Sequence, residues 1–292
     1  MQAADRSPYR GASEEAIRHH YDIGDAFYEL WLDPSLTYSC GLWEDGERGL
    51  AAAQRRKLDH LIGAAGAAGA ARVLDVGCGW GGHMRRLIGE HEAGHVVGLT
   101  LSEAQAASIA RWADHRCEVR VENWAEHEPD EPYRAILSVE AFEHFADFGM
   151  PRTARVNAYR EFFARCHEWL PPGGRLVIQT GVKGNNVRVE RELARELMFI
   201  VREVFPESEL PWIAEIFEAS QRRFEVVSVH NDPHDYVLTL GAWLERLQAS
   251  RTRAAELLGE RVVGDYERYL RTAALAYERH HLGLLRAVFE RV

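Results

Sequence analysis

The feature that most constrains the fold is a cluster of glycines between a short apolar segment and a helical one. Gly77, Gly79, Gly81 and Gly82 fall within six residues, directly after the apolar run of residues 72–76 (RVLDV). Each glycine destabilises regular structure by roughly 0.5–1 kcal/mol, so such a cluster is unfavourable unless the backbone must turn tightly or approach a ligand. A strand, a glycine-rich turn and a helix in this order are typical of a Rossmann-like nucleotide site.

Two ligands fit the turn, and the residues around it separate them. Gly77, Gly79 and Gly82 satisfy the dinucleotide pattern GxGxxG, but an NAD site also needs an acidic residue at the end of the second strand. That strand ends in Leu99 and Thr100, with no carboxylate at its tip. S-adenosylmethionine (SAM) is therefore favoured, with Asp75 anchoring the site directly or through backbone order. A turn that binds nothing is the weaker alternative.

Strand and helix patterns alternate along the chain after this turn. Helical segments separate the first strands, and a helix over residues 154–170 stops at the sequence PPGG. Ser102, with Gln105 three residues later, is a capping-box pattern that begins another helix. Such alternation predicts an α/β fold with a parallel, doubly wound sheet. The expected strands are residues 72–76, 95–100, 118–122, 135–139, 175–180 and 224–230.

The same pattern predicts a single domain over residues 1–292. The expected parts are N-terminal helices (1–70), a SAM-binding core (71–182), a helical lid (183–222) and a C-terminal part (223–292). The lid is rich in Arg and Glu, and the pattern after Tyr236 reads as helical to the end of the chain.

Charge and composition exclude several classes of partner. The formal net charge is −10, and there is no basic stretch to neutralise nucleic-acid phosphates. No apolar run approaches the roughly 18–20 residues that span a bilayer, and the N-terminus has no apolar signal segment. We expect a cytoplasmic protein without stable membrane insertion; a homodimer is compatible with the sequence. The four cysteines show no metal-site spacing, so no metal is expected.

Motifs along nearly the whole chain resemble the cyclopropane-fatty-acid and mycolic-acid cyclopropane synthases. They are HYDIGDAFY (20–28), LDP (32–34), TYSC (37–40), LDVGCGWG (74–81), GLTLS (98–102) with Gln105, and AFEHF (141–145). The acid–x–Phe-Glu-His pattern of residues 140–144 is also similar to plant alkaloid N-methyltransferases. The resemblance implies a class I SAM-methyltransferase fold, and SAM converted to S-adenosylhomocysteine (SAH).

The resemblance also implies roles for individual residues. The expected SAM contacts are Tyr38, Ser39, Gly77, Gly79, Thr100, Leu101 and Gln105, with Trp124 against the adenine and Asn123 nearby. A bicarbonate ion is the second expected ligand and acts as the base in this family. Its ligands map onto Cys40, Glu143, Tyr236 and the backbone near Val139. Gln179 stands where the family has a histidine, and unlike histidine it cannot carry a positive charge.

The candidate catalytic residues each have an alternative interpretation. Glu143 is expected to hold bicarbonate or act as a base itself; otherwise it is a buried acid that caps a turn. His144 either orients Glu143 and relays a proton, or packs in the interior. Cys40 is expected to contribute backbone contacts and packing and not a nucleophile, and Tyr236 an acceptor-site hydroxyl or a core ring.

Three functions remain open at this point. The first is a methyltransferase that acts on a small, secondary-metabolite-like acceptor at carbon or nitrogen, which the changed residues around the anion site favour. The second is a cyclopropane or methyl-branch synthase acting on the double bond of a fatty-acyl lipid, which the N-terminal motifs favour. The third is a SAM-binding protein without catalysis.

Overall fold

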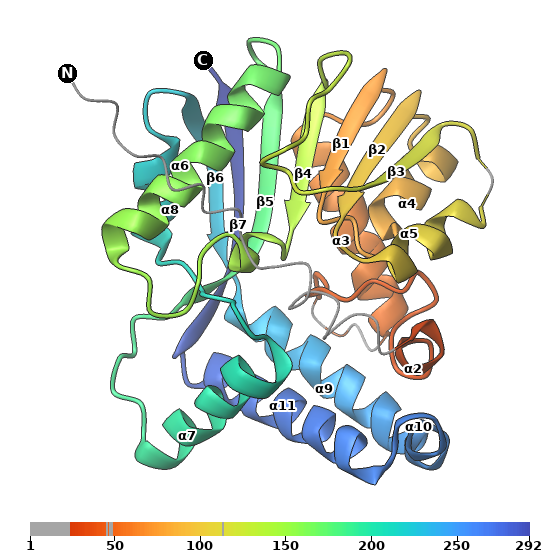
Figure 1. Ribbon diagram of the computed structural model, residues 1–292, viewed down its shortest axis with the longest axis vertical. Coiled ribbons are helices and arrows are strands. Elements are labelled where there is room, and N and C mark those ends of the chain that lie inside the picture. The colour runs from red at the N-terminus through yellow and green to blue at the C-terminus, as the bar shows by residue number, and fades with distance from the viewer. Residues whose placement is uncertain (1–23, 45, 47–48, 113) are drawn as a thin grey trace.

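The computed structural model describes residues 24–44, 46, 49–112 and 114–292, and its centre is one seven-stranded sheet (Figure 1). The strand order is β3-β2-β1-β4-β5-β7-β6. The strands are β1 (Arg72–Val76), β2 (His95–Thr100), β3 (Cys117–Val121), β4 (Ala135–Val139), β5 (Arg175–Lys183), β6 (Phe224–Asn231) and β7 (Leu282–Arg291). The six expected strands are all present, with bounds shifted by at most a few residues.

The sheet is mixed, which corrects the expectation of a parallel one. β1 to β5 pair in parallel, whereas β7 runs antiparallel to both β5 and β6. β7 lies in the segment that was expected to be helical. Its apolar run is buried on both faces, and a short run of this kind has no alternation that would separate a strand from a buried helix.

Helices cover both faces of the sheet and give a three-layer α/β/α arrangement. One face packs against α3 (Leu50–Ala65), α4 (Gly82–Glu90) and α5 (Glu103–Ala110). The other packs against α6 (Arg152–Trp169) and α8 (Ile213–Ser220), where aromatic residues such as Phe162 and Phe163 are fully buried. Alternate residues of each strand supply the two cores, as the period of two along a strand requires.

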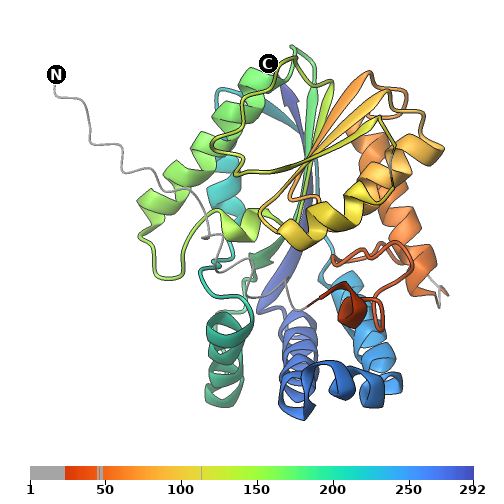
Figure 2. The ribbon, with the colours of Figure 1, turned by 45° about the vertical axis from the view of Figure 1, so that its right-hand side comes forward.

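A further group of helices lies beyond one end of the strands, visible as a separate layer in Figures 1 and 2. It contains α7 (Arg191–Phe199), the π-helix η2 (Ile200–Val204), α9 (Pro233–Ala249), α10 (Arg251–Leu258) and α11 (Glu260–Glu278), and α2 (Asp25–Tyr28) packs against it. Its core is aromatic and includes Trp31, Trp243 and Tyr266. Residues 20–23 of the N-terminal motif lie outside the described residues. In the part of the chain that the structure describes, no helix has the length and apolar character to cross a membrane.

Candidate active site

The glycine turn joins β1 to α4 in backbone conformations that other residues rarely adopt. Gly77 and Gly79 have φ angles of +79° and +55°. The N–H groups of Gly77 and Cys78 donate to the carbonyl of Leu99 at 3.0 and 2.9 Å, so the turn is tied to the end of β2. A Cβ atom on Gly77 would lie only 2.5 Å from that of Ala141. Glycine is therefore needed at this position by both conformation and space.

A cavity lies beside the turn, at the carboxyl ends of β1, β2 and β4. Ligands bind at this edge of open α/β sheets. The expected SAM contacts line the cavity with the exception of Asp75: they are Tyr38, Ser39, Gly77, Gly79, Thr100, Leu101, Gln105, Asn123, Trp124 and Val139. The structure therefore brings together residues from five separate parts of the sequence.

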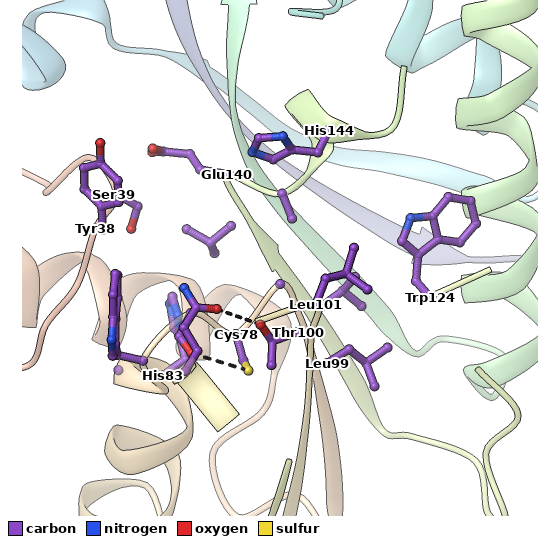
Figure 3. A pocket seen from close by; sticks show the side chains of 18 of the residues that line it. Tyr38, Ser39, Cys78, His83, Leu99, Thr100, Leu101, Trp124, Glu140 and His144 are labelled. Carbon is purple, nitrogen blue, oxygen red and sulfur yellow. Dashed lines mark hydrogen bonds between the residues drawn. The ribbon is translucent and has the colours of Figure 1, made fainter. Parts of the chain in front are cut away.

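The shape and chemistry of the cavity suit a ligand with a flat ring at one end and a charged amino-acid group at the other. Figure 3 shows Tyr38 and Ser39 at one end, Trp124 at the opposite end and Thr100 between them. The buried Trp124 ring offers a flat apolar surface for adenine. His83 also lines the cavity, and its Nε2 atom is buried without a hydrogen-bond partner among the described residues. These residues fit SAM.

Asp75 lies beneath the turn and not on the cavity wall. Its side chain is buried, and burial raises the pKa of this carboxyl to about 7, although the Lys57 ammonium lowers it. Asp75 is therefore not in a position to contact SAM directly in the cavity. Ordering of the backbone through this residue stays a prediction.

Lys57 is a wholly buried cation behind the cavity, and the sequence alone gives it no role. Its Nζ atom donates to the Ser39 hydroxyl at 2.7 Å. Burial lowers the pKa of the Lys57 ammonium to about 8, while the charges of Glu140 and Asp33 act in the opposite direction. One signal was available: Lys57 and Lys183 are the only lysines in a chain that otherwise uses arginine.

Glu140 occupies the centre of the residues that were expected to bind bicarbonate. Its Oε1 atom accepts hydrogen bonds from the backbone N–H of Cys40 at 2.8 Å and from Nε2 of Gln179 at 2.9 Å. Its Oε2 atom accepts one from the Tyr236 hydroxyl at 2.5 Å. The carboxylate also lies on the wall of the cavity. Cys40 and Tyr236, two of the predicted ligands, therefore converge with Gln179 on a carboxylate that belongs to the chain, whereas Glu143 does not join them.

Arg286 of β7 lies directly behind this group and was not predicted. Its Nε atom donates to Oε1 of Gln179 at 2.9 Å, which directs the amide N–H₂ of Gln179 toward Glu140. The rest of the guanidinium is held by the Asp235 carboxylate at 2.8 Å and by the Gly41 carbonyl at 2.8 Å. Gln179 and Arg286 face each other in the β5–β7 register, so the antiparallel strand sets this contact.

Glu143 lies apart from that network. It sits on a short 3-10 helix, η1 (Phe142–His144), and its Oε1 atom accepts a hydrogen bond from the backbone N–H of Gly181 at 2.6 Å. Its Oε2 atom is buried and has no hydrogen-bond partner in the described part of the chain. Burial, and secondarily the charge of Glu140, raises the pKa of the Glu143 carboxyl to about 8. Burial therefore favours the neutral form of Glu143.

His144 and Cys40 are both uncharged in this environment. Burial lowers the pKa of His144 to about 4, and its Nδ1 atom pairs with the Ser208 hydroxyl at 2.9 Å while the ring lines the cavity. Burial raises the pKa of the Cys40 thiol well above its ordinary value, the Arg286 charge lowering it only in part. We therefore infer that Cys40 contributes its backbone N–H and packing, and that its thiol is not a nucleophile.

A layer of tyrosines adjoins Glu140 on the side of the helical layer. The rings of Tyr236 and Tyr277 pack with centroids 4.5 Å apart, and the Tyr38 hydroxyl donates to that of Tyr269 at 3.3 Å. Burial raises the pKa of Tyr236 well above its ordinary value, so its hydroxyl keeps its proton. The surroundings of Glu140 are therefore aromatic and uncharged on this side.

Comparisons with known proteins agree over most of the chain. The family model described as "Mycolic acid cyclopropane synthetase" matches residues 10–287. Cyclopropane mycolic acid synthase 2 of Mycobacterium tuberculosis is 36% identical over 270 residues, which cover 88% of each chain. The protein of the same name from Mycobacterium leprae is 36% identical over 272 residues, covering 88% of this chain and 87% of that one.

Solved structures show the same likeness. The cyclopropane synthase MmaA2 from Mycobacterium tuberculosis superimposes with a TM-score of 0.88 at 32% identity, covering 96% of this chain and 99% of that chain. Mycolic acid cyclopropane synthase CmaA1, complexed with SAH and CTAB, gives a TM-score of 0.86 at 31% identity with the same coverage. Coclaurine N-methyltransferase, at 19% identity and a TM-score of 0.78, shares the fold.

Proposed function

The chain belongs to the mycolic acid cyclopropane synthetase family and is a SAM-dependent one-carbon transferase, and from this premise we propose that its acceptor is a carbon–carbon double bond in a fatty-acyl lipid. The product is a cyclopropane or a methyl branch. This reverses the preference drawn from the sequence motifs, because the relatives from Mycobacterium tuberculosis and Mycobacterium leprae are named as cyclopropane mycolic acid synthases.

One observation carries the proposal: a carboxylate on the wall of the SAM cavity borders a layer of aromatic rings. An alkene that accepts a methyl group becomes a carbocation. The negative charge of Glu140, on the cavity wall beside the Tyr236 ring, would stabilise that positive charge. Since no cationic side chain hydrogen-bonds to Glu140 among the described residues, this charge is not neutralised by direct pairing.

The residues of the chain then have separate tasks. Bound SAM supplies an electrophilic methyl group. The cavity wall from Tyr38 to Trp124 aligns the reactants, which is a large part of catalysis for such a transfer. The alkene π electrons form the new carbon–carbon bond, and sulfur keeps the electrons of the bond that breaks. Glu140 takes a proton from the added carbon, and the electron pair of that C–H bond closes the ring.

A second candidate is methyl transfer to carbon or nitrogen of a small metabolite. An acceptor of this kind needs only to lose its own proton, and the same carboxylate of Glu140 can take it. Gln179, in place of the histidine of the family pattern, is the observation that favours this candidate.

SAM with a trideuterated methyl group separates these candidates. The protein is incubated with unsaturated phospholipid vesicles and, in parallel, with a metabolite extract, and the products are read by mass spectrometry. A lipid product with two deuteriums means that a proton left the transferred carbon, as ring closure requires. A lipid product with three indicates a methyl branch, also within the proposal. Labelled small molecules without any labelled lipid would overturn the proposal in favour of the second candidate.

A further inference from the structure

We propose that Glu140 is a built-in proton acceptor that takes the place of a dissolved anion, so that turnover of this enzyme does not require bicarbonate. The inference rests on the proposed function only in that a methyl transfer releases a proton. It holds for either acceptor, and its experiment is chosen accordingly.

The groups around the Glu140 carboxylate have the geometry of a site for a small anion. The two carboxylate oxygen atoms accept three hydrogen bonds, from the Cys40 backbone, Gln179 and Tyr236. The donors come from the segment before α3, from β5 and from α9, so three separate elements converge on one group. Such a set would hold any small planar oxyanion, and the Glu140 side chain already fills it.

The donors that hold this carboxylate carry no charge. An amide, a backbone N–H and a phenol are all neutral, and the Tyr236 hydroxyl keeps its proton because burial raises its pKa. They fix the carboxylate without forming an ion pair with it. The Arg286 guanidinium is linked to Glu140 through the amide of Gln179. The carboxylate is therefore positioned and still able to accept a proton.

The backbone at Glu140 has a conformation that glycine adopts readily. Its φ angle is +51°, in the left-handed region where glycine is comfortable and a side chain is strained. The backbone N–H of Glu140 also donates to the Gln179 carbonyl at 2.7 Å, which fixes this conformation. Glycine at this position would keep the backbone, remove the carboxylate and leave its donors around an empty space. Replacing Glu140 with glycine should therefore let a dissolved anion occupy the position of the Glu140 carboxylate.

The proton balance needs no further reactant. The acceptor loses one proton, from the added carbon or from its own nitrogen or carbon, and its electron pair stays with the product. Glu140 becomes a neutral carboxylic acid and returns the proton to water after the product leaves. No oxidant or reductant takes part.

The test compares the wild type, Glu140→Gly and Glu140→Gln in buffer freed of carbon dioxide, with and without added sodium bicarbonate. We expect wild-type turnover to change less than twofold between the two buffers. Glu140→Gly should lose 100-fold or more, in the range that a proton acceptor contributes, and regain at least tenfold on addition of bicarbonate. Glu140→Gln should lose as much and regain nothing, because its amide still fills the space.

A binding measurement without acceptor keeps the test independent of the substrate. Bicarbonate should raise the melting temperature of Glu140→Gly, since a ligand that binds the folded state stabilises it, and should leave the wild type unchanged. SAH titration confirms that each variant is folded. Bicarbonate dependence of the wild type, or full activity of Glu140→Gln, would overturn the inference. A labelled metabolite in place of a labelled lipid would overturn only the proposed acceptor.

Discussion

Replacing Lys57 with methionine should stabilise the protein at neutral pH and weaken cofactor binding. The Lys57 ammonium is wholly buried, and its pKa is about 8, against an ordinary value of 10.5. A difference of one pKa unit corresponds to 1.36 kcal/mol, so the charged form costs the folded state about 3 kcal/mol at pH 7. The lost hydrogen bond to Ser39 offsets about 1 kcal/mol of the gain. The net expectation is about 2 kcal/mol in favour of the variant.

The difference in stability between Lys57→Met and the wild type should depend on pH. Below pH 8 the lysine is charged in both the folded and the unfolded protein, and the full cost applies. Between pH 8 and 10.5 the unfolded chain binds more protons than the folded one, so wild-type stability rises by about 1.4 kcal/mol per pH unit. Methionine has no such slope. The advantage of the variant should therefore be largest at pH 7 and nearly absent at pH 9.5.

Urea unfolding at pH 7 and pH 9.5 measures the two free energies, and calorimetric titration with SAH measures binding. The Ser39 hydroxyl loses its donor in the variant, so we expect SAH affinity to fall about 5- to 10-fold, from the worth of one hydrogen bond. Lys183→Met is the matched control, because Lys183 is the other lysine, is about a third exposed and pairs with Glu209. A Lys57→Met protein that is less stable than wild type at pH 7, or equally stabilised at both pH values, would refute the reasoning.

Two more substitutions test the turn and the second carboxyl group. Gly77→Ala should reduce SAH affinity tenfold or more in calorimetry, because the new Cβ would lie 2.5 Å from that of Ala141; Gly69→Ala has a similar positive φ and open space, and should bind SAH like wild type. The folded pKa of Glu143 is about 8, above its ordinary 4.5, so the stability that this group contributes is complete below pH 4.5 and is lost as the pH rises through 8. The melting temperature of Glu143→Gln, compared with that of the wild type, should thus be more favourable at pH 8 than at pH 4.5. Its turnover should stay within about fivefold of the wild type. A loss as deep as that of Glu140→Gln would instead identify Glu143 as the proton acceptor.

The sequence predicts the parts of this site that depend on short segments. The glycine turn follows β1 directly, Ser102 caps α5 through the backbone N–H of Gln105, and Thr100 ends β2. Each is determined by residues a few positions away, and the parallel strands bring their carboxyl ends to one edge. That is why most of the residues predicted to contact SAM line one cavity in the structure, with the exception of Asp75.

The proton-acceptor group could not be predicted in the same way, because its members are distant in the sequence. Glu140 meets Cys40, Gln179 and Tyr236, which are 100, 39 and 96 residues away. In the sequence, Glu143 is the more obvious candidate, since it lies in the FEH motif three residues later. In the structure the Glu140 carboxylate, and not that of Glu143, contacts these donors, and Glu140 has a positive φ.

The strand that the sequence did not reveal is also the strand that completes this group. β7 runs antiparallel between β5 and β6, and this register places Arg286 opposite Gln179. The guanidinium contacts the oxygen of the Gln179 amide, so the N–H₂ group points toward Glu140 and donates to it. A helix over residues 282–291 would leave Gln179 free to present either end of its amide, and the presence of glutamine in place of histidine would then weaken the site. With Arg286 in position, glutamine becomes a directed donor to a carboxylate, so the substitution at residue 179 and the carboxylate at residue 140 are explained together.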